Sequence, residues 1–81
     1  MELGHIRYFK AVAEEKNFTR AAEKLAIAQP PLSRQIQDLE AELGTQLFIR
    51  SPHKVTLTEE GELFLQYASQ ILDLVHRSEE E

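Results

Sequence analysis

Apolar residues recur every three or four positions over residues 3–25, the spacing of amphipathic helices. Leu3, Ile6 and Phe9 predict a first helix over residues 3–15, which Gly4 weakens. A second, shorter helix is predicted from residue 18 to about residue 26, with Asn17 as its N-terminal cap. Its apolar positions are Phe18, Ala21, Ala22 and Leu25. The two alanines would allow a neighbouring element to approach closely.

A third helix is predicted over residues 30–43. Pro30 and Pro31 fit only the first turn of a helix, where the missing N–H donors cost nothing. Gly44 stands where a left-handed C-terminal cap is expected. The side predicted to face the core carries Leu32, Ile36, Leu39 and Leu43.

Two short strands, residues 46–50 and 54–57, are predicted to form a β-hairpin across Ser51-Pro52-His53. Thr58 precedes two glutamates, which predicts a capped helix that runs to about residue 78. The predicted order is therefore three helices, a hairpin and one long helix.

The apolar residues of the last helix spread over about 200° of its circumference, although packing on one core needs a stripe of only about 100°. They are Leu63, Phe64, Leu65, Tyr67, Ala68, Ile71, Leu72, Leu74 and Val75. We expect self-association to cover the excess. The alternative is that the rest of the domain encloses this helix.

Composition indicates one small globular domain or a fragment of a longer chain, because 42% of the 81 residues are hydrophobic and 28% are charged. The chain has no cysteine, and the sequence shows no signal peptide or apolar run long enough to span a membrane. These features predict an intracellular protein without disulfides, thiol nucleophiles or cysteine-based metal sites.

The net charge of −5 conceals an uneven distribution. Residues 1–54 carry eight basic and seven acidic side chains, whereas residues 55–81 carry one basic and seven acidic side chains. Residues 16–36 carry four basic side chains and one acidic side chain. A local cationic surface is therefore possible in the middle of the chain.

The polar face of the third helix has an electrostatic direction. From residue 29 to residue 37 the only charge is that of Arg34, and Asp38, Glu40 and Glu42 follow in the C-terminal half. A groove lined by phosphates would accept this helix by its N-terminal end and repel the other end. Gln, Ser and Arg side chains read base edges, so duplex DNA is the predicted partner. The alternative is an ordinary solvated helix face.

The elements on either side of this helix favour DNA. A short helix, a turn at residues 27–29 and a helix opened by proline match the helix-turn-helix plan, in which the second helix enters the major groove. Arg50 and Lys54 flank the hairpin turn and predict a cationic wing. A hairpin that merely connects two helices is the alternative for this element.

Five segments in this order resemble the N-terminal domain of LysR-type transcriptional regulators. They are residues 18–25 (FTRAAEKL), 29–36 (QPPLSRQI), 39–44 (LEAELG), 47–50 (LFIR) and 57–61 (LTEEG). The resemblance covers nearly the whole chain. It implies a mainly α winged helix-turn-helix over residues 1–57 and a linker helix over residues 58–81 that pairs antiparallel with its mate.

The resemblance also implies a bacterial, cytoplasmic transcription regulator that binds a pseudo-palindromic operator as a dimer and needs no cofactor in this domain. In the family an effector domain follows, which this chain lacks, and higher oligomers are expected of the full-length protein. Gly4 and Ala28 stand where the family often has a cation and a Ser/Thr cap, and His53 stands where many members have arginine.

Two sets of site residues follow from position in the family. The DNA-facing set is Thr19, Arg20, Gln29, Pro30, Pro31, Ser33, Arg34, Gln37, Arg50, His53 and Lys54. The dimer set is Leu63, Phe64, Tyr67, Ile71, Leu74 and Val75.

Two other classes of function compete with DNA binding. An enzyme is disfavoured because the sequence holds no phosphate-binding glycine loop, zinc-protease motif or nucleophile elbow, and its histidines are scattered over three elements. A protein-interaction module that uses the last helix would explain the apolar excess. It would leave the charge direction of the third helix unexplained.

Overall fold

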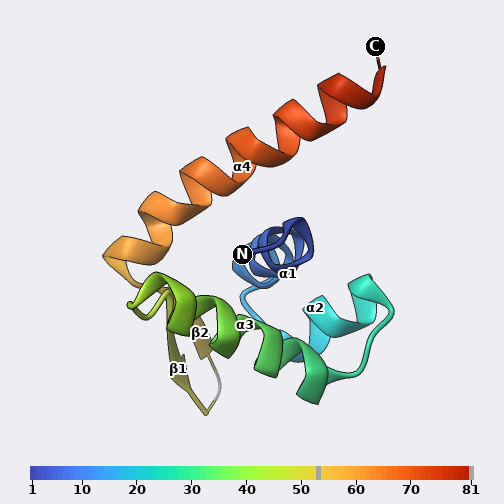
Figure 1. The fold of residues 1–81 in the computed structure, drawn as a ribbon. Coiled ribbons are helices and arrows are strands. Elements are labelled where there is room, and N and C mark those ends of the chain that lie inside the picture. Colours follow the sequence, from blue (N-terminus) through green and yellow to red (C-terminus); the bar gives the residue numbers. More distant parts are fainter. Residues whose placement is uncertain (53, 81) are drawn as a thin grey trace.

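The computed structural model describes residues 1–52 and 54–80 and confirms the predicted order of elements (Figure 1). The elements are α1 (Leu3–Glu15), α2 (Phe18–Leu25), α3 (Gln29–Leu43), β1 (Phe48–Ser51), β2 (Lys54–Leu57) and α4 (Glu59–Glu80). β1 and β2 form an antiparallel hairpin, called the wing below, in which Phe48 pairs with Leu57 and Ser51 with Lys54. None of the described helices combines the length and hydrophobicity needed to cross a bilayer.

The helix ends have local causes. The Asn17 side chain accepts a hydrogen bond from the backbone N–H of Arg20 at 2.9 Å, which confirms the predicted cap of α2. α3 begins at Gln29, one residue earlier than predicted, and Ala28 before it supplies no side-chain cap. Gly44 ends α3 with φ of 70°, the predicted left-handed conformation.

The start of α4 accounts for a difference in β1, which begins at Phe48 instead of residue 46. The Thr58 hydroxyl donates to the Gln46 carbonyl at 2.7 Å, and the Thr58 N–H donates to the Leu47 carbonyl at 3.0 Å. Those two carbonyls therefore bind the residue before α4. The same Thr58 oxygen accepts from the N–H of Gly61 at 2.9 Å, as expected of a cap.

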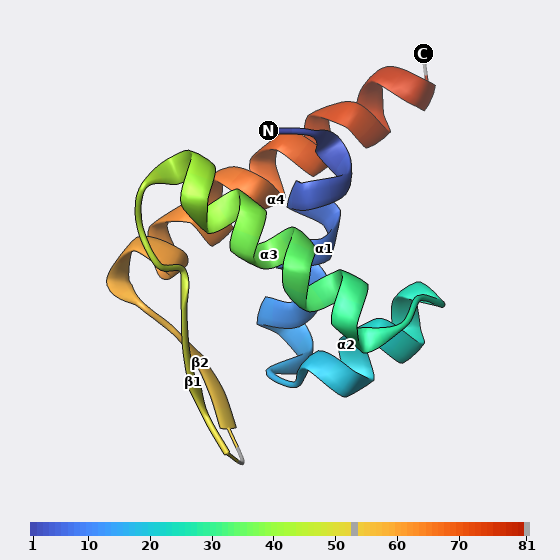
Figure 2. The same cartoon turned by 60° about the horizontal axis from the view of Figure 1, so that its bottom comes forward.

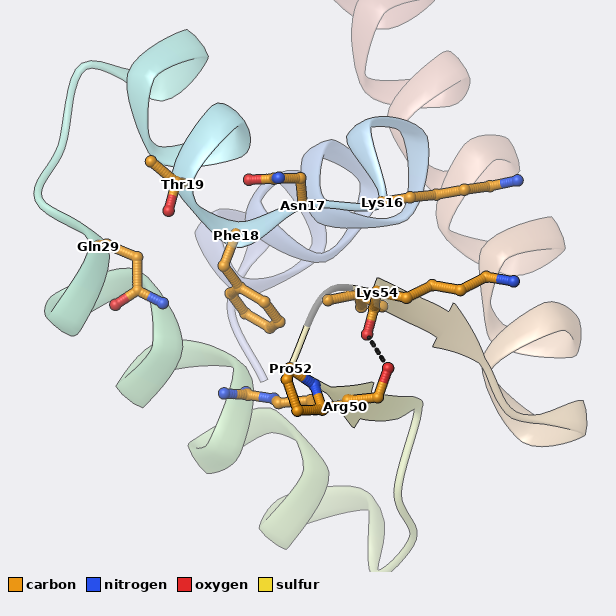
Figure 3. A pocket seen from close by; sticks show the side chains of 10 residues that line it. Lys16, Asn17, Phe18, Thr19, Gln29, Arg50, Pro52 and Lys54 are labelled. Carbon is orange, nitrogen blue, oxygen red and sulfur yellow. Dashed lines mark hydrogen bonds between the residues drawn. The ribbon is translucent and has the colours of Figure 1, made fainter.

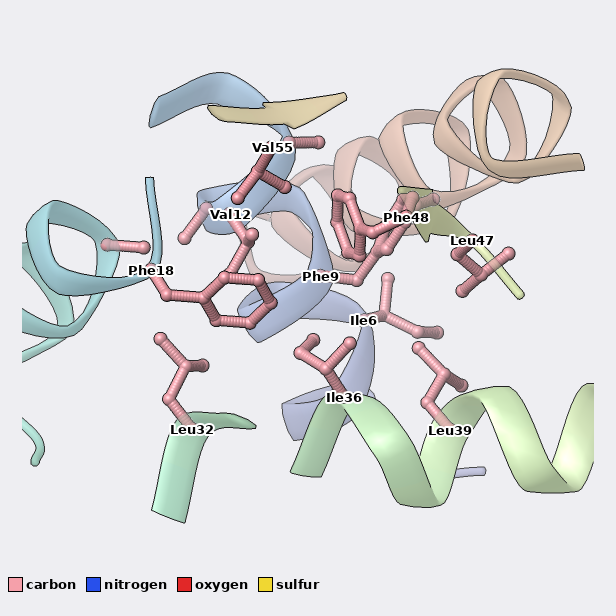
Figure 4. Packing of buried hydrophobic residues seen from close by; sticks show 14 of the residues in the cluster. Ile6, Phe9, Val12, Phe18, Leu32, Ile36, Leu39, Leu47, Phe48 and Val55 are labelled. Atoms are coloured by element: carbon pink, nitrogen blue, oxygen red, sulfur yellow. The ribbon is translucent and has the colours of Figure 1, made fainter. Parts of the chain in front are cut away.

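The core is built around α1, which packs against α2, α3 and α4. Phe9 is fully buried, and its ring centroid lies 5.2 Å from that of Phe48 (Figure 4). Its centroid lies 5.0 Å from that of Phe64. Phe18 lies 5.9 Å from Phe48. All four phenylalanines of the sequence thus form one chain of contacts that joins α1, α2, β1 and α4.

One of the four α3 residues predicted to face the core is not buried. Leu32, Ile36 and Leu39 have no exposed surface, but Leu43 is 37% exposed. It is the last residue of α3 and lies past the edge of the core. Leu43 instead borders an apolar hollow of about 240 Å³, called the α3–α4 hollow below, together with Thr45, Leu47, Glu60, Leu63, Phe64 and Tyr67.

The wide apolar arc of α4 is divided between two environments. Ala68 is buried, and Phe64, Leu65, Ile71 and Leu72 pack partly against the core. Leu63, Tyr67 and Leu74 remain 53%, 54% and 62% exposed. The domain therefore covers one side of α4 and leaves a stripe of large apolar side chains uncovered.

We predict that Gly61→Ala lowers the free energy of unfolding by about 1–3 kcal/mol, the usual cost of forcing atoms into a packed site. A Cβ at this position would overlap the backbone carbonyl of Leu47 and press on the Leu57 side chain. The control is Gly4→Ala, where a Cβ meets nothing within 4 Å. Helix propensity there should raise stability by up to about 1 kcal/mol. Urea denaturation measures both, and equal effects would contradict the role of close approach at Gly61.

Candidate nucleic-acid interface

The wing, α2 and the N-terminal end of α3 lie toward one end of the molecule (Figure 2). In both ribbon views the C-terminal end of α4 lies at the opposite end. Glu79 and Glu80, at the C-terminal end of α4, are therefore held away from the wing and the N-terminal end of α3, whereas Glu59, Glu60 and Glu62 lie in its first turn.

A cleft of about 450 Å³ separates the start of α2 from the wing (Figure 3). We call it the α2–wing cleft. It is lined by Lys16, Asn17, Phe18, Thr19, Gln29, Arg50, Ser51, Pro52, Lys54 and Val55. This lining includes three cationic side chains and no acidic one among the described residues. Such a surface attracts a polyanion.

A second cleft, of about 420 Å³, lies between α3 and the first strand of the wing and is called the α3–wing cleft. It is lined by Gln37, Glu40, Gln46, Phe48, Ile49 and Arg50. Arg50 borders both clefts, so its side chain lies where the wing meets the helix-turn-helix.

The Arg50 side chain is held by two contacts. Its Nη1 donates a hydrogen bond to the Ser33 hydroxyl at 2.7 Å. Its Cζ lies 4.0 Å from the centroid of the Phe18 ring, in the geometry of a cation–π contact. Arg50 thus connects the wing to the first residue of α2 and the N-terminal half of α3.

The base of the wing is tied to α3 by Glu40. Its carboxylate accepts hydrogen bonds from the N–H groups of Leu47 and Phe48 at 2.7 and 3.3 Å. Hydrogen bonds from N–H groups to a carboxylate are stronger than neutral ones, so this contact fixes the start of β1 relative to the helix.

The acidic end of α3 is partly neutralised within the fold. Glu40 binds the wing, and the Glu42 carboxylate pairs with the Met1 ammonium at 2.6 Å. Hydrogen bonding to that ammonium lowers the pKa of Glu42. Arg34 is the only charged side chain in the N-terminal half of α3, and it is exposed.

The structure brings together most of the residues predicted to face DNA. Thr19, Gln29, Arg50 and Lys54 line the α2–wing cleft, Gln37 lines the α3–wing cleft, and Ser33 contacts Arg50. Arg20, Pro30, Pro31 and Arg34 are exposed outside both clefts. His53 lies outside the described residues.

The DNA-facing set predicted from the sequence does not include six residues of the α2–wing cleft, namely Lys16, Asn17, Phe18, Ser51, Pro52 and Val55. Lys16 and Asn17 directly precede the α2 helix, and Asn17 is its cap. The sequence does place Lys16 directly before the N-terminus of α2, and a cation and a helix N-terminus both attract anions, so this pair could have indicated the site. Among the described residues, no group of three or more His, Asp or Glu side chains is arranged to hold a metal ion.

The sequence model of the bacterial regulatory helix-turn-helix proteins of the lysR family matches residues 3–62. The chain belongs to the lysR family. It is 61% identical over 75 residues to the HTH-type transcriptional regulator BenM of Acinetobacter baylyi. This match covers 93% of the present chain and 25% of BenM. It is 59% identical over 73 residues to the Hca operon transcriptional activator HcaR of Escherichia coli, covering 90% of this chain and 25% of HcaR.

The chain thus spans about a quarter of the length of these relatives, which are named as regulators and not as enzymes. The fold is similar to solved LysR-type structures. The crystal structure of the BenM_DBD/catB site 1 DNA complex superposes with a TM-score of 0.94 at 59% identity, covering 96% of this chain and 87% of that one. The CbnR_DBD-DNA complex gives 0.95 at 46% identity, covering 99% and 92%. These matches confirm the winged helix-turn-helix fold.

Proposed function

We propose that this LysR-type chain binds double-stranded DNA sequence-specifically, as the DNA-binding part of a transcription regulator that acts in the bacterial cytoplasm. Residues 1–57 form the DNA-binding unit in this proposal, and the helix that follows is the linker. One observation carries it: the end of α3 whose only charge is Arg34 lies beside a cleft lined by three cations and no acidic side chain among the described residues.

α3 enters the major groove by its N-terminal half in this proposal. Ser33 and Arg34 lie on this half and Gln37 lies just past the middle of the helix, and their side chains are of the types that bind base edges. Pro30 and Pro31 are exposed in the first turn and would pack against the groove wall. The acidic residues beyond Gln37 then lie at the far end of the helix.

The α2–wing cleft receives the phosphate backbone. Lys16, Arg50 and Lys54 supply positive charge, and the first turn of α2 supplies N–H groups beside Thr19. Arg20 is exposed on the same turn and extends this surface. The interface needs only side chains and backbone groups of the chain and no cofactor.

Two observations on similar proteins support the proposal. BenM_DBD and CbnR_DBD are both described in complexes with DNA, and this chain superposes on each over at least 96% of its length. The proteins in these two complexes have the same fold as this chain and are 59% and 46% identical to it in sequence.

We propose in addition that two copies pair antiparallel through α4. At 100° per residue, Leu63, Tyr67 and Leu74 fall within about 40° of one another, and all three are more than half exposed. The stripe continues into the α3–α4 hollow beside Leu43. Ile71, Val75 and Phe64 flank it and are partly buried. A two-fold pair would present two recognition helices to a pseudo-palindromic operator.

We predict that Arg34→Ala and Lys54→Ala weaken DNA binding in different ways. Loss of Arg34 should cost about 1–3 kcal/mol on the preferred sequence and reduce discrimination between sequences, because its contacts are to base edges. Loss of Lys54 should weaken binding to every duplex and reduce the slope of log K against log salt by about one phosphate's worth. Fluorescence anisotropy at several salt concentrations separates the two effects. Unchanged affinity in both variants would contradict the proposed interface.

We predict that Leu74→Asp shifts the dimer to monomer, with a dissociation constant raised at least about tenfold, because burying an unpaired carboxylate is costly. The side chain is 62% exposed in the single chain, so folding should be unaffected. Gln66→Asp is the matched control, as Gln66 is exposed on the polar side of the same helix. Analytical ultracentrifugation gives the result. A Leu74→Asp dimer as tight as the parent would place the pairing surface elsewhere.

A further inference from the structure

The position of the Arg50 guanidinium is set by the protein itself. A guanidinium has five N–H donors and two flat faces. One donor binds the Ser33 oxygen at 2.7 Å, and one face covers the Phe18 ring at 4.0 Å. Phe18 is only 7% exposed and belongs to the aromatic chain of the core, so the surface on which Arg50 rests is rigid.

The contact with Arg50 also decides which hydrogen bonds Ser33 can make. A serine in a helix commonly turns its proton back to the carbonyl four residues earlier. Among the described residues, the Ser33 side chain makes one hydrogen bond, and in that bond it accepts from Arg50. Its own proton is then left for a group outside the chain. Accepting from a cation also polarises the hydroxyl and makes it a better donor.

We infer that Arg50 is a positioning residue that makes Ser33 a hydrogen-bond donor toward DNA. The inference rests on the proposed function and adds to it the polarity of one contact. The partner that takes this proton is an acceptor: N7 of a purine, O6 of guanine, O4 of thymine or a phosphate oxygen. The amino groups of adenine and cytosine could bind only the second lone pair of the Ser33 oxygen, which would leave the proton unused.

This role differs from that of a simple cation on the wing. A phosphate contact needs charge, which lysine also supplies, whereas stacking on Phe18 with a directed N–H to Ser33 needs the planar guanidinium. Arg50→Lys therefore keeps the charge of the wing and removes the orientation of Ser33. Arg7→Lys is the matched control, because Arg7 is exposed on α1 and lies in neither cleft.

The test selects bound duplexes from a random pool with five proteins: the parent, Arg50→Lys, Ser33→Ala, the double variant and Arg7→Lys. Affinities for the selected sequence and its single-base variants follow by anisotropy. Ser33→Ala should reduce discrimination at one base position by about fivefold, the size of one net hydrogen bond. Arg50→Lys should reduce it at the same position, with little change in the salt slope. The double variant should match Ser33→Ala within about twofold, and Arg7→Lys should match the parent.

If Ser33→Ala weakens all sequences equally, the acceptor is a phosphate. The inference then requires that Arg50→Lys lower the affinity for all sequences by the same factor as Ser33→Ala. It also requires that Arg50→Lys cause no further loss of affinity when Ser33 is already alanine. Circular dichroism shows whether each variant is folded. Additive losses, or discrimination lost at different positions, would overturn the inference while DNA binding stands. A parent chain that enriches no sequence and binds without salt dependence would instead remove the proposed function itself.

Discussion

The geometry of the proposed interface depends on one chain of aromatic contacts, which runs from Phe18 through Phe48 and Phe9 to Phe64. Its centroids are 5.0–5.9 Å apart, and each ring comes from a different element. Phe18 opens α2 and Phe48 opens β1, so their contact sets the width of the α2–wing cleft. Arg50 then stacks on the outer end of this chain. The core thereby fixes the place of the Arg50 guanidinium.

Polar contacts complete what the aromatic chain begins. Glu40 holds the base of the wing, and Arg50 holds the side nearer its turn, so α3 and the wing form one surface. The first of these contacts directs the Glu40 carboxylate at backbone N–H groups of Leu47 and Phe48. Asp73, Glu79 and Glu80 lie in the C-terminal half of α4, whose end is at the far end of the molecule (Figure 1), whereas Glu59, Glu60 and Glu62 lie in its first turn. A chain with net charge −5 can thus present a cationic end to DNA.

Local signals made the elements predictable. Asn17 and Thr58 accept hydrogen bonds from N–H groups three residues later, Gly44 adopts a left-handed conformation, and each begins or ends a helix near the predicted position. The prediction that Leu43 faces the core was wrong, because helical periodicity does not show where a core ends. β1 begins two residues later than predicted, because Thr58 binds the carbonyl groups of Gln46 and Leu47. The contact between Arg50 and Ser33 spans 17 positions and depends on Phe18, so neither spacing nor charge could reveal it. The division into domains and the site residues remain predictions.

The central claim is that the N-terminal ends of α2 and α3 and the wing together bind DNA. Amide chemical shifts, followed while the chain is titrated with a duplex that it enriches from a random pool, test this claim most directly. The account predicts that the largest changes fall on residues 16–20, 29–37 and 50–54, and that they diminish as salt is added. Changes confined to α4, or shifts that do not respond to salt, would contradict it.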